Sequence, residues 1–272
     1  MSKVSFRKME FPFSKTGFEK YWHGGSPFIT FFFNALSSAF PPGEVFFCET
    51  VRRYRERVES EELQQSIDQF IHQELHHVLH HRNFNRMVAK QGFNIKKAEK
   101  RNADFLKHVR DNYKPEDQLA FTLAFEHFTA ALADQILTND RLLKPADPNV
   151  AALWLWHAAE ETEHKSVAFE VFDAIEGSYW SRVKVYLLAF YKLFSIAFLN
   201  QFEMLRDDGS FSIGDTYRGL RFLLGKGGLL RGVFRSLLDY LKPSFRPDEV
   251  DNYHLTEKWE QENQDKILSK AS

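Results

Sequence analysis

Two segments of the chain carry a glutamate followed three residues later by a histidine. Glu74 precedes His77 in this way, and Glu161 precedes His164. Residues three apart lie on one side of an α-helix, so each pair can turn a carboxylate and an imidazole toward one point. These two groups are typical ligands of iron, manganese and zinc ions. Each Glu-x-x-His pair therefore predicts part of a metal site.

Both pairs interrupt stripes of apolar residues. Phe70 and Phe84 share the face of the first pair, and Leu153 and Val171 share the face of the second. Burying a carboxylate among apolar side chains costs free energy unless a partner compensates. Two divalent ions would compensate several such groups at once. The alternative is a helical bundle whose polar core residues satisfy one another.

Two single glutamates complete the pattern. Glu126 lies in an apolar band, and Glu44 shares a face with Phe40 and Phe47. The order Glu, Glu-x-x-His, Glu, Glu-x-x-His matches helical bundles that hold two metal ions in their core. We therefore predict an all-α, ferritin-like four-helix bundle with these ligands: Glu44, Glu74, His77, Glu126, Glu161 and His164. Glu49 is the alternative to Glu44, although it leads into a charged segment.

Two further histidines lie near these ligands. His157 precedes Glu161 by four residues and is expected to bind metal itself, or to donate a hydrogen bond that orients a carboxylate. His81 lies seven residues after Glu74, and we expect it to hydrogen-bond to a ligand or to be an ordinary core histidine.

Other polar residues on the same helices are weaker candidates. Asn85 could orient the site from the turn after His81, and Glu160 is a marginal outer partner or base. A separate row formed by His72, His76 and His80 could hold zinc, but such rows are more often partly solvated.

The elements that must position these residues are helices joined by short links. Helical periodicity covers residues 26–40, 61–90, 115–137, 148–175 and 181–200, and another helix follows Pro41-Pro42-Gly43 from Glu44 to about residue 62. We expect residues 1–24 to form an N-terminal extension and residues 25–180 the metal-binding bundle. Residues 181–272 are predicted to form additional C-terminal helices packed on the bundle and a polar tail.

Composition limits the partners and the location. The 272 residues include 36 Lys+Arg and 37 Asp+Glu, so the net charge of -1 offers no cationic surplus for nucleic acid. The single cysteine, Cys48, and the lack of an apolar leader predict a cytoplasmic protein. The apolar segment 185–199 is shorter than the roughly 20 residues that span a bilayer. It predicts a buried or interfacial helix. Contact with a membrane surface and formation of a homodimer are both left open.

Several motifs resemble a bacterial family described as predicted metal-dependent hydrolases. They are Pro-Gly-Glu-Val-Phe-Phe (42–47), Gln-Glu-Leu-His-His (73–77), Phe-Glu-His-Phe-Thr (125–129), Trp-His-Ala-Ala-Glu-Glu-Thr-Glu-His-Lys (156–165) and Tyr-Leu-Lys-Pro-Ser-Phe-Arg-Pro (240–247). The resemblance implies metal binding by the six ligands above, with His81 and His157 at further polar positions. The spacing of His157, Glu161 and His164 is also similar to that of di-iron N-oxygenases. The last motif departs from the family at Arg246, where a histidine is more usual.

The ligand set suggests three kinds of function. Two ions, iron first with manganese or zinc as alternatives, could support oxidation of a small organic substrate by dioxygen. A metal-bound hydroxide could instead hydrolyse an ester, an amide or a phosphate. Iron binding or a purely structural bundle is the non-enzymatic alternative. Phe190 and Phe194 in the apolar segment are expected to help form a pocket for an apolar small-molecule substrate.

Overall fold

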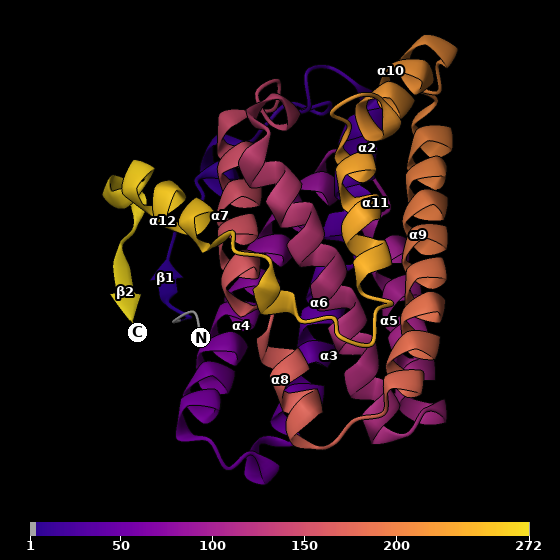
Figure 1. The fold of residues 1–272 in the computed structure, drawn as a ribbon. Helices are drawn as coiled ribbons and strands as arrows, with labels where there is room; N and C mark the ends of the chain where they lie inside the picture. The colour runs from indigo at the N-terminus through magenta and orange to yellow at the C-terminus, as the bar shows by residue number, and fades with distance from the viewer. Residues whose placement is uncertain (1–3, 272) are drawn as a thin grey trace.

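The computed structural model describes residues 4–271 and consists almost entirely of helices (Figure 1). The prediction of an all-α fold is confirmed. The α-helices are α1 Phe13–Thr16, α2 Pro27–Ser37, α3 Phe40–Arg52, α4 Glu61–Lys90, α5 Ile95–Asn112, α6 Pro115–Thr138, α7 Pro148–His164, α8 Val167–Ala174, α9 Tyr179–Asp208, α10 Ile213–Leu224, α11 Leu229–Asp239 and α12 Tyr253–Glu262. Two short strands, β1 Phe6–Lys8 and β2 Ser269–Ala271, pair antiparallel and bring both ends of the chain together.

The centre of the molecule is built from α3, α4, α6 and α7, which lie side by side (Figure 1). Local chemistry fixes where three of them begin. Ser60 accepts a hydrogen bond from the backbone N–H of Leu63 at the start of α4, and Asp147 does the same for Asn149 before α7. A proline occupies the first turn of α6, where its missing N–H has no partner to lose. These starts set the depth at which each helix presents its polar residues.

Several helices differ from the sequence-based expectation, among them α9, which continues to Asp208 instead of ending near residue 200. Helix α3 begins at Phe40 because the prolines at 41 and 42 fit its first turn, and it ends at Arg52 instead of continuing to about residue 62. The expected helix 148–175 is interrupted at Lys165 and Ser166, so that α7 and α8 are separate. Helix α5 was not expected from the sequence.

The additional helices cover the central four. Helix α9 packs on α2 and α6, α11 packs on α6, and α10 packs on α2 and α11. The left-handed conformation of Gly209, with φ of 68°, ends α9 and turns the chain toward α10. Of the described helices, α9 is long and apolar enough to cross a membrane by length and composition alone.

Strand β1, near the start of the chain, packs against the helices. Strand β1 lies along α4, and α12 packs on α7 at the same side of the molecule (Figure 1). Arg7 is 2% exposed and pairs with Glu163 and Glu260, which ties β1 to both α7 and α12. The ring of Phe6 stacks on His72 at a centroid separation of 3.9 Å.

Candidate metal centre

The structure brings the seven predicted ligands into one buried cluster. Helix α3 contributes Glu44, α4 contributes Glu74 and His77, α6 contributes Glu126, and α7 contributes His157, Glu161 and His164. None of these residues is more than 4% exposed. Spacing of three and four residues within α4 and α7 keeps each helix's donors on one side, and the packing of four helices turns those sides inward.

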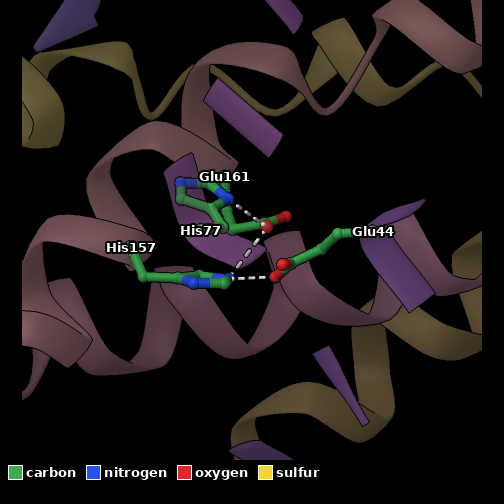
Figure 2. A group of neighbouring side chains, drawn as sticks. All are labelled: Glu44, His77, His157 and Glu161. Atoms are coloured by element: carbon green, nitrogen blue, oxygen red, sulfur yellow. Dashed lines mark ion pairs between the residues drawn. The ribbon is translucent and has the colours of Figure 1, made fainter. Parts of the chain in front are cut away.

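The first group in the cluster contains Glu44, His77, His157 and Glu161. Each offers a donor atom, and these atoms all lie within 4.8 Å of one another. Nε2 of His157 lies 2.9 Å from Oε1 of Glu161 and 4.0 Å from Oε1 of Glu44 (Figure 2). Although Nε2 of His157 and Oε1 of Glu161 are close, their alignment does not meet the geometry of a hydrogen bond. The three side chains therefore converge on a common point.

The second group contains Glu74, His77, Glu161 and His164, again with donor atoms within 4.8 Å of one another. Nδ1 of His77 lies 3.7 Å from carboxylate oxygens of both Glu74 and Glu161. Nδ1 of His164 lies 3.6 Å from Oε1 of Glu74 and 3.2 Å from Oε2 of Glu126. Glu161 and His77 belong to both groups, so the two groups form one continuous cluster.

Many polar atoms of the cluster have no hydrogen-bond partner among residues 4–271. They are both carboxylate oxygens of Glu44 and of Glu74, Oε1 of Glu126, Nδ1 of His77, and Nε2 of His157 and His164. A buried polar atom without a partner costs roughly 1–3 kcal/mol. Several such atoms gathered at one place fit a site that metal ions complete.

The electrostatics of the cluster are those of carboxylates crowded in an apolar interior. Burial, with repulsion from neighbouring carboxylates, raises the pKa of Glu44 and Glu74 well above their usual range. Burial and the charge of Glu161 raise the pKa of Glu126 to about 7. Burial opposes protonation of His164, but Glu161 and Glu126 outweigh it and raise its pKa to about 9.

Glu161 is the exception among the carboxylates. Burial would raise its pKa, but the nearby His164 and His157 hold the pKa below its usual value. The hydroxyl of Thr129 also donates a hydrogen bond of 2.5 Å to Oε2 of Glu161. Glu161 is thus the carboxylate most readily ionised in this cluster.

A directional chain of hydrogen bonds leads away from His157. The Ser37 hydroxyl donates to Oδ1 of Asn85, whose amide group is oriented by donating to the backbone oxygen of Ser37 and to Glu99. The Ser37 oxygen must then accept from Nδ1–H of His81, at 2.9 Å. Burial lowers the pKa of His81 well below its usual value, so the ring is neutral and its Nε2 is bare.

These hydrogen bonds determine which nitrogen of His157 faces the cluster. Bare Nε2 of His81 accepts from Nδ1–H of His157 at 3.0 Å. Nδ1–H of His157 is thus engaged, so Nε2 is the ring nitrogen that faces Glu161 and Glu44. A metal-ligating histidine has this arrangement, in which the ring nitrogen that does not bind the ion donates to a fixed partner.

Glu160 and Glu163 face away from the convergent atoms. Oε2 of Glu160 hydrogen-bonds to Nε2 of His77 at 3.1 Å, which fixes the ring that turns Nδ1 inward. Glu163 pairs with Arg7 at 2.6 Å. The two acids are thus engaged on the outer side of α7.

The remaining candidates lie elsewhere. Glu49 is on the surface and pairs with Arg110 at 2.7 Å, so Glu44 is the α3 carboxylate in the cluster. His72, His76 and His80 form the expected row on α4, but it lies under the rings of Phe6 and Phe11 and is not among the described groups able to hold an ion.

Two residues with direct roles at the cluster were not expected from the sequence. Thr129 follows Glu126 by three residues and so lies on the same side of α6, a spacing that could have indicated it. Ser37 has no comparable signal, because its contact with His81 joins α2 to α4 across the fold.

An all-α protein with a buried cluster of carboxylates and imidazoles is, by its site, a candidate metalloprotein. The chain belongs to the family of predicted metal-dependent hydrolases, whose model matches residues 5–251. The resemblance seen in the motifs is thereby confirmed, and the family supports metal dependence while leaving the reaction class open. No curated protein and no solved structure matches the sequence. The ferritin-like comparison stays a prediction.

Proposed function

We propose that the chain binds two divalent metal ions, with iron as the best candidate, and oxidises a small apolar substrate with dioxygen. The observation that carries the proposal is the convergence of unpartnered carboxylate oxygens and imidazole nitrogens, with Nε2 of His157 turned toward them. Four carboxylates would balance the charge of two divalent ions. Oxygen donors combined with imidazole suit iron and manganese.

The chain's own residues would hold and orient this centre. Glu161 belongs to both groups and could bridge the two ions, while Thr129 fixes its outer oxygen. Glu160 and His81 fix the rings of His77 and His157 through their outer nitrogens. Bound iron would supply the electrons needed to reduce dioxygen. Such outer partners typically change metal affinity or activity by 10- to 100-fold.

An apolar pocket beside the cluster supports oxidation of an apolar molecule. Residues of α3, α6 and α9 line it, among them Phe47, Phe128, Leu193 and Ile196, and no charged side chain takes part. Phe40 also lines the pocket, and its ring stacks on His157 at 4.6 Å. Leu193 and Ile196 form the α9 wall in place of the expected Phe190 and Phe194. A phosphate would meet no cation in this lining, whose polar members are Asn102 and Thr129.

Hydrolysis by a metal-bound hydroxide, as the family description suggests, is the second candidate. It would use the same ligands together with a base that accepts a proton. Glu160 and Glu163 are the nearest acids outside the ligand set on α7, and both are already engaged. That engagement favours oxidation.

Metal analysis of protein purified without chelators, with optical spectra before and after dithionite and again in air, tests the proposal. We expect two irons per chain and an absorption band that disappears on reduction and returns in air. Two redox-silent ions such as zinc would favour hydrolysis. Absence of bound metal, even after the purified protein is incubated with Fe²⁺, would leave the cluster as a polar core and refute the proposal.

A further inference from the structure

One side of the molecule exposes large apolar side chains along three consecutive helices, α9 to α11, which lie on the right of Figure 1. On α10 these are Ile213, Tyr217, Leu220 and Leu224, whose spacing of four, three and four residues places them on one side of the helix. Ile213 is 82% exposed and Tyr217 is 69% exposed. Helix α10 thus turns an apolar stripe to the outside.

The neighbouring helices extend this apolar surface. On α9, Trp180, Leu187, Tyr191, Phe198 and Phe202 are all exposed and recur at intervals of seven and four residues. On α11, Phe234 and Leu238 are 42% and 67% exposed. Monomeric soluble proteins rarely expose apolar residues in such continuous rows, which mark a surface that contacts something else.

Cations accompany the apolar residues. Residues 213–239, which span α10 and α11, contain five lysines and arginines (Arg218, Arg221, Lys226, Arg231 and Arg235) and two acids, Asp215 and Asp239. Asp215 is buried, accepts hydrogen bonds from Ser26 and from the N–H of Phe28, and pairs with Arg218. The other four cations have no ion-pair partner among residues 4–271. The positive charge is therefore concentrated here, although the chain as a whole carries a net charge of -1.

Helix α9 cannot leave the fold to span a bilayer without breaking polar contacts. Arg182 is buried and donates hydrogen bonds to the backbone oxygens of Tyr240 and Lys242. Near the other end, Gln201 donates to the backbone oxygen of Phe28 at 2.9 Å. One side of α9 is thus fixed to the protein, and the other side is apolar and open.

We propose that the outer face of α9, α10 and α11 rests on the surface of an anionic lipid bilayer. Apolar side chains would enter the boundary between headgroups and acyl chains, and the unpaired arginines and Lys226 would meet lipid phosphates. A second copy of the chain fits less well, because a twofold interface would set this cationic face against itself. The proposal does not depend on the metal content of the protein.

Vesicle flotation of the full chain tests the proposal, with phosphatidylcholine vesicles that either contain or lack phosphatidylglycerol. We expect binding to the anionic vesicles, with binding reduced by salt. The double variant Arg221→Gln/Arg235→Gln should bind about 25-fold more weakly, since each cation near such a surface contributes about fivefold. Ile213→Ser/Leu238→Ser should also lose binding, because it removes side chains that would enter the bilayer.

A matched control removes two cations elsewhere. Lys100→Gln/Lys107→Gln alters exposed lysines of α5 that pair with Asp104 and Asp111, and vesicle binding should be unchanged. Circular dichroism and metal content should match wild type in every variant. Equal binding to neutral vesicles, or full binding by the arginine variant, would overturn the proposal. The proposal would also be overturned if the wild-type protein bound no vesicles and instead formed a dimer that the variant Ile213→Ser/Leu238→Ser dissociates.

Discussion

Replacing Glu74 by glutamine should leave the stability of the metal-free protein almost unchanged while strongly weakening its affinity for metal. Glu74 is fully buried, and burial with repulsion from neighbouring carboxylates raises its pKa, which favours the protonated, uncharged form when no ion is bound. Glutamine has nearly the same shape and is also uncharged. We therefore expect the free energy of unfolding of the metal-free protein to change by no more than about 1 kcal/mol.

The effect on metal binding should be much larger. The oxygens of Glu74 lie 3.6 Å from Nδ1 of His164 and 3.7 Å from Nδ1 of His77, so an ion held by these nitrogens would lie within about 4 Å of the carboxylate. Two unit charges at that distance interact by about 4 kcal/mol at an effective dielectric constant of about 20; a divalent ion doubles this figure, and displacing the proton of Glu74 offsets part of the gain. Loss of the charge should weaken the affinity about a thousandfold.

Titration against a competing chelator, combined with thermal unfolding with and without metal, measures both quantities. Glu163→Gln is the matched control, because Glu163 is also buried but pairs with Arg7 away from the cluster. It should lower the Tm of the metal-free protein and leave the affinity unchanged. The reasoning is refuted if Glu74→Gln destabilises the metal-free protein as much as Glu163→Gln does and binds metal within about threefold of wild type.

Four other predictions follow from the same contacts. Glu161→Ala should sharply reduce the metal bound per chain while helicity by circular dichroism survives, because Glu161 belongs to both groups, and full stoichiometry would contradict that assignment. Ser37→Ala should weaken metal affinity about tenfold, because His81 then loses the partner that fixes its ring and so no longer orients His157; a chelator titration equal to wild type would exclude this. Metal affinity should fall as the pH drops below about 7, because protons then occupy Glu126 and compete with the ions; calorimetry should detect proton release on binding. Ile196→Trp should fill the apolar pocket, whose volume is about 50 Å³, and abolish binding of xenon measured by NMR with metal content intact, whereas Leu187→Trp on the exposed side of α9 should retain it.

Residue spacing within a helix carried most of what could be predicted. Glu74 with His77, and Glu161 with His164, had to share a side once their segments were helical, and the structure brings them together with Glu44 and Glu126. The apolar residues around them indicated which side faces the core. Whether a segment is helical, and which side of that helix faces the core, depend on neighbouring residues and can therefore be predicted from the sequence.

Contacts between helices could not be predicted in this way. The hydrogen bond from Thr129 to Glu161 and the one between Ser37 and His81 depend on how separate helices pack. At the break after α7, the buried side chain of Lys165 donates a hydrogen bond to Asn252, almost ninety residues further along the chain. Periodicity within a segment contains no information about such distant partners.

The membership of Glu161 in both groups links the filling of the two candidate ion positions. An ion at the first position would displace protons from the cluster and fix the Glu161 carboxylate between the two positions. The second ion would then meet a Glu161 carboxylate that is already oriented and a neighbouring Glu74 that has already lost its proton, so its binding would be favoured by the first. Such positive cooperativity predicts that protein given one equivalent of metal is a mixture of empty and fully loaded molecules, with few molecules holding a single ion.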